Sequence, residues 1–258
     1  MSSAPLLEVR GLRAGYGASL VLDDFSFSMG IEAVGIVGRN GMGKTTLCDT
    51  LVGFLPPSGG QVLLRGERVD GMSPERIARA GMAYVPQGRR LFPSLTVDEH
   101  LAMLARGTRN KRWTPDAVYA LFPRLAERRK HGGANLSGGE QQMLAVGRAL
   151  LLNAHLVVMD EPSEGLAPTI VDVLVDAVHH LVEEGVAVLV VEQNLRAAVR
   201  MADRQIVMVS GRIEAEFAAD ELATRPDLQH RYLGVGTAPA SHPAAWRGSP
   251  TSRSAPQP

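Results

Sequence analysis

The chain has 258 residues, of which 45% are hydrophobic, which is enough for one large domain or two small ones with a substantial core. Its 27 basic and 27 acidic residues cancel, and this argues against general nucleic-acid binding, which usually requires a basic excess. The single cysteine, Cys48, excludes a disulfide framework and fits a reducing compartment. No secretion signal is expected, and no apolar run approaches the ~20 residues of a transmembrane helix.

Short apolar runs alternate with helical patterns along most of the chain. The expected strands are 6–10, 20–28, 33–37, 61–64, 82–85, 156–159, 186–191, 206–209 and 213–217, with turns at 14–17 and 65–67. The expected helices are 45–54, a short one from 73, 96–105, 114–129, 137–152, 168–183, 195–202 and 220–233. This alternation predicts an α/β fold whose mostly parallel sheet binds ligands at the carboxyl ends of its strands.

Two stretches depart from the alternation. Residues 88 to about 152 are predominantly helical and are expected to form an insertion in the α/β chain. Residues 237–258 are rich in Pro, Ser and Ala without any period, so they are expected to be disordered.

The most specific motif is Gly38-Arg39-Asn40-Gly41-Met42-Gly43-Lys44-Thr45-Thr46, which fits G-x-x-x-x-G-K-S/T. It lies between an expected strand and an expected helix, so the free N–H groups of the helix N-terminus converge on one point. Glycines let the backbone curl around a phosphate chain, Lys44 supplies a positive charge, and the Thr45 hydroxyl is placed to bind Mg²⁺. A glycine-rich turn without a ligand is the weaker alternative, because all these features agree.

A second candidate follows the apolar run 156–159, which ends in Asp160 and Glu161. The carboxyl end of this strand should lie beside the phosphate loop. Asp160 can then bind the hydration shell of Mg²⁺, and Glu161 can orient and polarise a water for attack on the γ-phosphate.

The third candidate is Leu136-Ser137-Gly138-Gly139-Glu140-Gln141, in which Ser137 and Glu140 form a capping box. A cap does not explain Gly138 and Gly139, since glycine disfavours a helix. Small residues at a helix N-terminus do let a ligand approach the backbone. Either the chain binds two anionic ligands, or this second N-terminus completes the first site from another subunit.

Three further polar or aromatic residues lie near expected strand ends. Tyr16 could stack on a purine or be an ordinary turn tyrosine. Gln87, which follows the strand 82–85, could reach Mg²⁺ or the attacking water. Gln193 could donate to a phosphate, and the neighbouring Asn194 could cap the next helix.

Together, these residues resemble the nucleotide-binding subunit of an ABC transporter over about residues 6–234. The phosphate loop, Gln87, the 136–141 signature and Asp160-Glu161 occur in the order of that family. The resemblance implies a single ABC domain over 1–236, with a P-loop NTPase core, an antiparallel β subdomain and a helical subdomain at about 88–152.

The resemblance also implies a head-to-tail dimer that holds two ATP molecules between its subunits. Tyr16 would stack on adenine, and residues 38–46 of one subunit would hold the phosphates. Ser137, Gly138 and Gly139 of the other subunit would cap the γ-phosphate. Glu161 is then the general base, Asp160 binds Mg²⁺ through water, and Gln87 senses Mg²⁺ and couples the site to the permease.

Two positions depart from the wider family, which usually has an aspartate where Ala167 stands and a histidine on the γ-phosphate where Gln193 stands. Gln193 can hydrogen-bond a phosphate but cannot become charged, which leaves its share in catalysis open. The stretches 84–97, 163–168 and 191–194 nevertheless resemble one subgroup closely. Its members are the ATP-binding subunits of branched-chain amino-acid uptake systems and their urea and amide relatives.

The sequence therefore predicts an ATP-hydrolysing importer subunit at the cytoplasmic face of the plasma membrane. Its expected partners are a second ATPase subunit (the same chain or a paralogue), separate membrane permease subunits and, indirectly, a periplasmic or extracellular solute-binding protein. No nucleic-acid partner is expected. The alternatives are a soluble ABC protein that acts as an assembly or nucleic-acid-associated switch, and a nucleotide-binding protein that hydrolyses weakly. The solute stays open, because its contacts lie on other chains.

Overall fold

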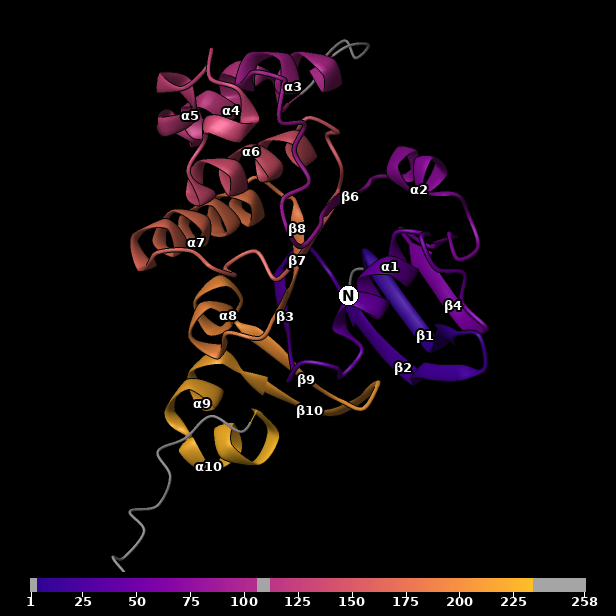
Figure 1. Cartoon of the computed structure of the whole chain (residues 1–258). Coiled ribbons are helices and arrows are strands. Elements are labelled where there is room, and N and C mark those ends of the chain that lie inside the picture. The colour runs from indigo at the N-terminus through magenta and orange to yellow at the C-terminus, as the bar shows by residue number, and fades with distance from the viewer. Residues whose placement is uncertain (1–3, 106–111, 234–258) are drawn as a thin grey trace, which may run out of the picture.

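A six-stranded sheet forms the centre of the computed structural model, which describes residues 4–105 and 112–233 (Figure 1). In spatial order its strands are β10 (Arg212–Ala218), β9 (Arg204–Val209), β3 (Ala33–Val37), β8 (Ala187–Glu192), β7 (Leu156–Asp160) and β6 (Met82–Val85). All are parallel except β10, which pairs antiparallel with β9. The sheet brings the carboxyl ends of β3, β7 and β8 to one rim, as predicted.

A second, four-stranded sheet is wholly antiparallel, with the order β2 (Ser19–Met29), β1 (Leu7–Tyr16), β4 (Gly59–Leu64) and β5 (Glu67–Arg68). The helix α1 (Lys44–Leu51) contacts strands of both sheets. One apolar cluster, which includes Leu47 and Cys48 of α1, fills the space between the sheets. The predicted antiparallel part of the fold is thereby confirmed.

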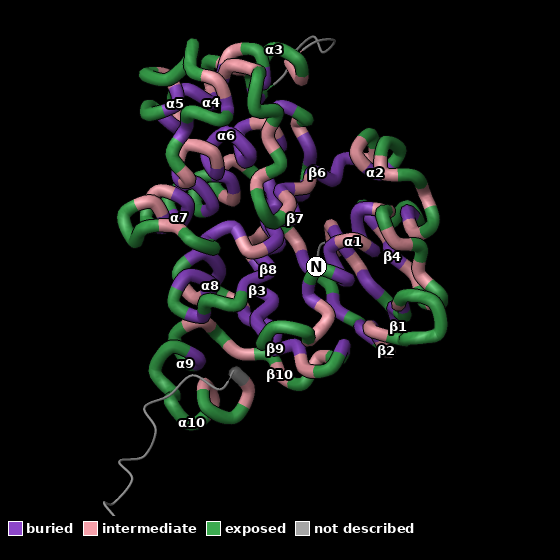
Figure 2. The backbone as a smooth tube through the Cα atoms, viewed as in Figure 1, coloured by how far each residue is buried: buried purple, intermediate pink, exposed green. Residues whose placement is uncertain are grey.

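Helices cover the opposite face of the central sheet and one of its ends. Figure 1 places α7 (Pro168–Glu183) and α8 (Leu195–Met201) beside the sheet, and α9 (Ala219–Thr224), α10 (Pro226–Leu228) and the π turn η2 (Gln229–Leu233) below them. The helical insertion consists of α3 (Val97–Ala105), α4 (Pro115–Leu121), α5 (Pro123–Glu127), the 3₁₀ turn η1 (Gly133–Asn135) and α6 (Gly138–Leu150). The short helix α2 (Pro74–Ala80) precedes β6. The tube in Figure 2 is buried through the central strands, a mixture of intermediate and exposed at α2, and mostly exposed at α10.

Two of the predicted helices, 114–129 and 220–233, are wrong in the same way. The expected helix 114–129 is divided into α4 and α5 at Phe122, whose backbone is extended (φ −124°, ψ 76°) because Pro123 follows. The expected helix 220–233 is divided at Arg225 (φ −110°, ψ 90°), which precedes Pro226. Proline disfavours the helical conformation at the residue before it, and this local rule prevails over the apolar spacing.

Two glycines with positive φ values shift the predicted ends of a helix and a turn by a few residues. The helix α1 ends at Leu51 rather than at residue 54, because Gly53 adopts the left-handed conformation with φ 83°. The turn expected at 14–17 is shorter, with Gly17 at φ 58°, so Tyr16 is the last residue of β1 and pairs with Ser19.

The predicted caps of α6 and α8 are confirmed, whereas Ser73, expected to cap the short helix α2, makes no side-chain capping bond. Ser137 and Glu140 form a reciprocal capping box at α6, and the Asn194 side chain accepts a hydrogen bond from the Ala197 N–H at α8. Of the helices in the described residues, none has the length and hydropathy of a transmembrane helix. The predicted disorder of 237–258 and the domain end at 236 lie outside the described residues.

Candidate functional site

The phosphate loop joins β3 to α1 and is shaped by close backbone contacts. A Cβ on Gly38 would lie 2.6 Å from the carbonyl oxygen of Met208 in β9, so no other residue fits there. Gly43 adopts φ 103° immediately before the helix begins at Lys44. The loop therefore ends on a helix N-terminus with free N–H groups, which is the geometry that binds phosphate.

Lys44 lies at the centre of this loop and its side chain is only 4% exposed. Its Nζ donates to the carbonyl oxygens of Gly38 at 3.0 Å and Arg39 at 3.2 Å. It also forms an ion pair with Glu161 Oε1 at 3.2 Å. The lysine and the candidate general base are thus paired with each other in this structure.

A cleft of about 480 Å³ opens above the loop. Its lining residues are Val21, Asn40, Gly41, Gly43, Lys44, Thr45, Thr46, Gln87, Glu161 and Glu164. Most of these were predicted from the sequence, and the structure brings them together from the loop, from the end of β6 and from the end of β7. Val21 and Glu164 were not predicted.

Asp160 is the last residue of β7 and lies buried beneath the cleft. Burial raises the pKa of its carboxyl to about 6, and the nearby charge of Glu161 adds to this rise while the Thr45 hydroxyl opposes it. Asp160 Oδ2 accepts a long hydrogen bond from the Tyr84 hydroxyl at 3.4 Å. Within the described residues, Oδ1 has no hydrogen-bond partner. A buried carboxylate oxygen without a partner is costly and suits a site for a cation or its hydration shell.

Glu161 has a left-handed backbone with φ 47°, which is unusual for a residue other than glycine. Such a conformation costs on the order of 1 kcal/mol or more and is concentrated at functional sites. Its N–H donates to the Val191 carbonyl of β8 at 2.8 Å, which fixes the turn after β7. The turn directs the carboxylate to Lys44 and to Gln87, whose Nε2 lies 3.3 Å from Oε2.

Glu164 holds Gln87 from the other side. Gln87 Nε2 donates to Glu164 Oε2 at 2.9 Å, which is shorter than its contact with Glu161. Arg89 donates to the backbone carbonyl of Glu164 at 3.2 Å. The segment after β6 is therefore attached to the loop after β7, and no local sequence signal indicated this contact.

A smaller cavity of about 350 Å³ adjoins the cleft and shares Glu161 and Glu164 with it. Gln193 and Asn194, which follow β8, line it on the far side. The structure thus places Gln193 on the predicted rim, close to Glu161 but outside the lining of the phosphate-loop cleft.

Besides Gly38, Asp160 and Gln193, four further predicted residues do not line the cleft in this chain. Tyr16 is 54% exposed at the end of β1, where its hydroxyl contacts Asp49 of α1. Ser137, Gly138 and Gly139 lie at the N-terminus of α6. A Cβ on Gly139 would come within 2.9 Å of Ile170, so packing explains that glycine. The nearest atoms to a Cβ on Gly138 among the described residues belong to the flexible Arg89 guanidinium, at 3.3 Å or more.

The segment after Gln87 is strained and is held by the helical insertion. Gly88, Arg89 and Arg90 all have positive φ values, of 77°, 64° and 42°. Arg148 of α6 donates to the Arg90 carbonyl at 3.1 Å. His100 of α3 accepts from the Phe92 N–H at 3.0 Å through Nε2, while its Nδ1 lies 2.8 Å from the Thr96 carbonyl.

This histidine should make stability depend on pH. Burial lowers the pKa of His100, the charge of Arg148 acts in the same direction, and Glu99 and the Thr96 carbonyl oppose it. The unfolded chain takes up a proton near its ordinary pKa of about 6.5, whereas the folded chain does so only at lower pH. The contribution of His100 to the free energy of unfolding is therefore expected to fall as pH drops below about 6.5.

Urea unfolding of the full chain between about pH 5 and 7 measures this effect. The variant His100→Gln should lose less stability across this interval than the wild type. The exposed His179→Gln serves as the matched control and should keep the wild-type slope. Equal slopes for wild type and His100→Gln would contradict the expectation.

Comparison with known proteins decides the family. Residues 22–164, more than half of the chain, match the family described as "ABC transporter". The chain belongs to the ABC transporter family. This confirms the family and the P-loop ABC ATPase fold predicted from the motifs, and with them the ATPase activity characteristic of the family.

Individual members of the ABC transporter family match nearly the whole chain. A high-affinity branched-chain amino-acid transport ATP-binding protein of Pseudomonas aeruginosa is 42% identical, over 85% of this chain and 95% of that protein. A probable branched-chain amino-acid transport ATP-binding protein of Archaeoglobus fulgidus is 32% identical, over 89% and 99%. A nucleotide-free ATP-binding cassette from an ABC transporter matches with a TM-score of 0.77 and 24% identity, over 90% and 100%, and supports the fold.

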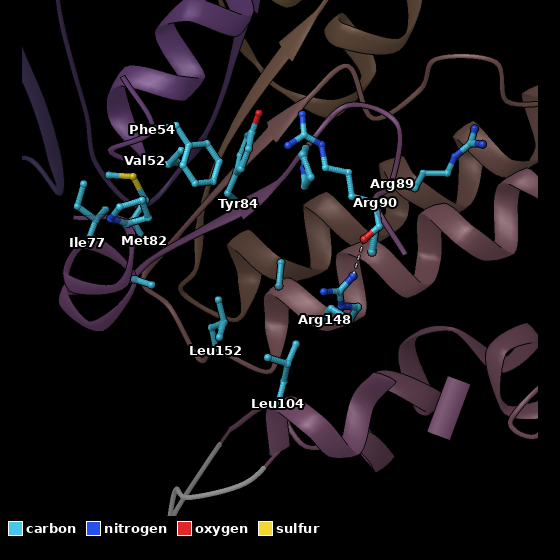
Figure 3. A pocket seen from close by; sticks show the side chains of 15 residues that line it. Val52, Phe54, Ile77, Met82, Tyr84, Arg89, Arg90, Leu104, Arg148 and Leu152 are labelled. Carbon is cyan, nitrogen blue, oxygen red and sulfur yellow. Dashed lines mark hydrogen bonds between the residues drawn. The ribbon is translucent and has the colours of Figure 1, made fainter. Parts of the chain in front are cut away.

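This ABC transporter subunit carries one more concave surface, between the phosphate-loop core and the helical insertion (Figure 3). The groove of about 320 Å³ is lined by Val52, Phe54, Pro74, Ile77, Ala78, Met82, Tyr84, Pro86, Arg89, Arg90, Leu104, Ala145, Arg148, Ala149 and Leu152. Phe54 and Tyr84 meet edge to face with centroids 6.0 Å apart. The groove begins where the Gln87 segment leaves the cleft, at Pro86, Arg89 and Arg90, and no pattern in the sequence indicated it.

Proposed function

We propose that this chain binds and hydrolyses ATP to energise the uptake of branched-chain amino acids or related small polar solutes through separate membrane permease subunits. The observation that carries the ATPase part is the pairing of Lys44 with Glu161 in a cleft at the N-terminus of α1. The 42% identity to a branched-chain amino-acid transport ATP-binding protein supports the solute class. On this proposal the chain works at the cytoplasmic face of the plasma membrane.

ATP binds in the cleft with its phosphates on the 38–46 loop. Gly38, Asn40, Gly41 and Gly43 provide the backbone curvature and N–H groups, and Thr45 and Thr46 continue them into α1. Lys44 turns from Glu161 to the outer phosphates, because a phosphate chain carries more negative charge than one carboxylate. This exchange releases the Glu161 carboxylate.

Mg²⁺ fits the residues beneath the phosphates. Within the described residues Asp160 Oδ1 has no hydrogen-bond partner, the Thr45 hydroxyl interacts with the Asp160 carboxyl, and Thr45 and Gln87 line the same cleft. All three side chains carry oxygen atoms of the kind that Mg²⁺ binds. When bound there, the ion neutralises phosphate charge. Asp160, Thr45 and Gln87 would hold it directly or through water.

Glu161 acts as the general base. Its backbone conformation aims the carboxylate at the centre of the cleft, where it accepts a proton from the water that attacks the γ-phosphate. Gln87 contributes by orienting this water, and Gln193 donates a hydrogen bond to a phosphate from the adjoining cavity. Tyr16 is assigned to adenine stacking, for which its exposed ring is suited.

A second copy of the chain, or a paralogue, completes the site. The N-terminus of α6 has its own free N–H groups, and Ser137, Gly138 and Gly139 do not line the cleft of their own chain. In a head-to-tail dimer they would cap the γ-phosphate bound by the other subunit. ATP then bridges the two subunits, and hydrolysis releases them.

The apolar groove is the docking site for a permease segment. Phe54 and Leu152, 55% and 43% exposed, form apolar walls, while Arg89, Arg90 and Arg148 bring positive charge to one side (Figure 3). A short cytoplasmic helix with an apolar face and an acidic residue fits this surface. Since Arg89 also contacts Glu164, docking and the state of the cleft are mechanically linked.

The variant Leu152→Glu is expected to reduce recovery of the chain with its permease by about tenfold, since a charge in an apolar contact costs about 1.4 kcal/mol or more. Leu152 is already partly exposed, so the free energy of unfolding should change little. The control is Ile31→Glu, an exposed apolar position away from the groove. Equal recovery of both variants with membranes would contradict docking at this groove.

Affinity purification from the native host and uptake of radiolabelled leucine test the transport function. The chain should copurify with membrane permease subunits, and its deletion should abolish uptake, with restoration by wild type but not by Lys44→Ala. Recovery of ribosomes or DNA alone would contradict the transport function. Normal leucine uptake in the deletion strain would contradict the solute class.

A further inference from the structure

Glu192 is a buried acid that the reaction described above does not use. It is the last residue of β8, whose other residues are apolar, and it is 2% exposed. The strand β8 lies between β3, which leads into the phosphate loop, and β7, which ends at Asp160. Glu192 therefore sits at the centre of the catalytic rim.

Backbone N–H groups surround its carboxylate. Oε1 accepts from the Ser163 N–H at 2.8 Å, and Oε2 accepts from the N–H groups of Gln193 at 3.1 Å and Asn194 at 3.2 Å. Burial raises the pKa of Glu192 and the charge of Glu161 adds to the rise, whereas the side chain and N–H of Ser163 and the N–H of Asn194 oppose it. Within the described residues no basic side chain pairs with this carboxylate, so its hydrogen bonds link the two loops.

The donors come from two different loops. Ser163 lies 29 positions before Glu192, in the loop that begins with Glu161, whereas Gln193 begins the loop before α8. The Glu161 N–H to Val191 carbonyl bond ties the same two segments at 2.8 Å. Both loops line the cavity that adjoins the phosphate cleft.

A carboxylate suits this place because its two oxygens face opposite loops. A hydroxyl would offer one oxygen on a shorter side chain, and an amide would present N–H groups to one of the two sets of donors. An acid kept merely to satisfy the cap of α8 would need no contact with Ser163, since Asn194 already caps that helix.

We propose that Glu192 is a positioning residue of ATP hydrolysis: its carboxylate joins the loop that follows Glu161 to the loop that carries Gln193, so that both sides of the site keep one geometry. This rests on the proposed ATPase function. Glu192 does not touch the phosphates. It acts through the backbone of Ser163 and Gln193, which set where the Glu161 and Gln193 side chains point.

The isosteric variant Glu192→Gln tests the link in the full chain. Its single side-chain oxygen can accept from only one of the two loops at a time, and its amide N–H groups then face the N–H donors of the other loop, so neither loop keeps its full set of bonds. We expect kcat for ATP to fall on the order of tenfold to a hundredfold, as a misplacement of catalytic groups by about 1 Å can cause. The KM for ATP should stay within about twofold of the wild type, because the phosphate loop and Lys44 are untouched.

Amide hydrogen exchange gives a readout that does not need hydrolysis. In Glu192→Gln, protection should be lost together in the 162–167 and 193–194 segments, with no loss in the 38–46 loop. Glu183→Gln, an exposed acid of α7, is the matched control and should behave as wild type. Glu192→Asp, which keeps the charge but shortens the side chain, should show the same loss in kcat.

The outcomes separate the two proposals. An active wild type with unaffected kcat or unaffected exchange in Glu192→Gln overturns the positioning role and leaves the ATPase function standing. A rise in KM parallel to the fall in kcat also overturns it, because it would indicate general damage to the site. A wild type that does not hydrolyse ATP rejects the ATPase function and the positioning role together.

Discussion

Replacing Glu161 by glutamine is expected to lower the ATPase rate of the full chain by a factor on the order of a hundred or more, because general bases contribute about 10²–10⁴ to such reactions. The glutamine keeps the size of the side chain and can still meet Gln87. It cannot accept the proton of the attacking water. ATP should still bind, so the loss falls on kcat.

The ion pair with Lys44 sharpens this expectation. In the structure Glu161 Oε1 lies 3.2 Å from Lys44 Nζ, so the carboxylate competes with phosphate for the lysine. Glu161→Gln removes that competitor, while the bonds from Lys44 to the Gly38 and Arg39 carbonyls stay. The affinity for ATP should therefore be equal to or tighter than that of wild type.

Size-exclusion chromatography with ATP and Mg²⁺ provides the second measurement. Glu161→Gln should elute as a stable ATP-bound dimer, because closure persists when hydrolysis cannot reset it. The exposed Glu183→Gln is the control and should hydrolyse and elute as wild type does. The general-base role is wrong if wild type and Glu161→Gln both stay monomeric and hydrolyse ATP at equal rates.

Much of this site was predictable because its residues lie at strand ends. Lys44 follows β3, Asp160 ends β7 and Gln193 follows β8, and parallel neighbouring strands bring their carboxyl ends to one rim. Local pattern and topology together suffice for such residues. Phe122 and Arg225 each precede a proline, which disfavours the helical conformation at the residue before it. Both prolines are visible in the sequence, but the apolar spacing of the expected helices favoured continuous helices through them.

Other contacts depend on tertiary structure alone. Glu164 reaches Gln87 across 77 positions, and nothing in the residues beside it indicates this. Glu192 is the last residue of an apolar strand, and the sequence indicates only that the strand ends there. In the structure its carboxylate joins two loops. From the sequence, Gly139 is explained by the approach of a ligand. In the structure a Cβ at this position would lie 2.9 Å from Ile170, so packing also requires a glycine there. Such cases require distances between segments that a single sequence does not contain.

Substitutions at Gly138 and Gly139 of α6 are therefore expected to have different effects. The difference tests whether the N-terminus of α6 caps the γ-phosphate bound by a second subunit. Gly139 packs against Ile170, so Gly139→Ala should destabilise the fold, because its Cβ would lie 2.9 Å from that side chain. Gly138 has no such neighbour besides the flexible Arg89 guanidinium. An acid at the first turn of a helix is compatible with its dipole, so Gly138→Asp should fold normally.

Gly138→Asp is expected to bind ATP as a monomer with wild-type affinity and to lose ATPase activity by a factor on the order of a hundred, like the loss of one preorganised donor to a transition state. Its carboxylate would stand where the partner's γ-phosphate approaches and would repel it. Combined with Glu161→Gln, it should abolish the ATP-bound dimer on size-exclusion chromatography. If Gly138→Asp keeps wild-type ATPase activity or the double variant still forms the dimer, the N-terminus of α6 does not cap a phosphate on a second subunit.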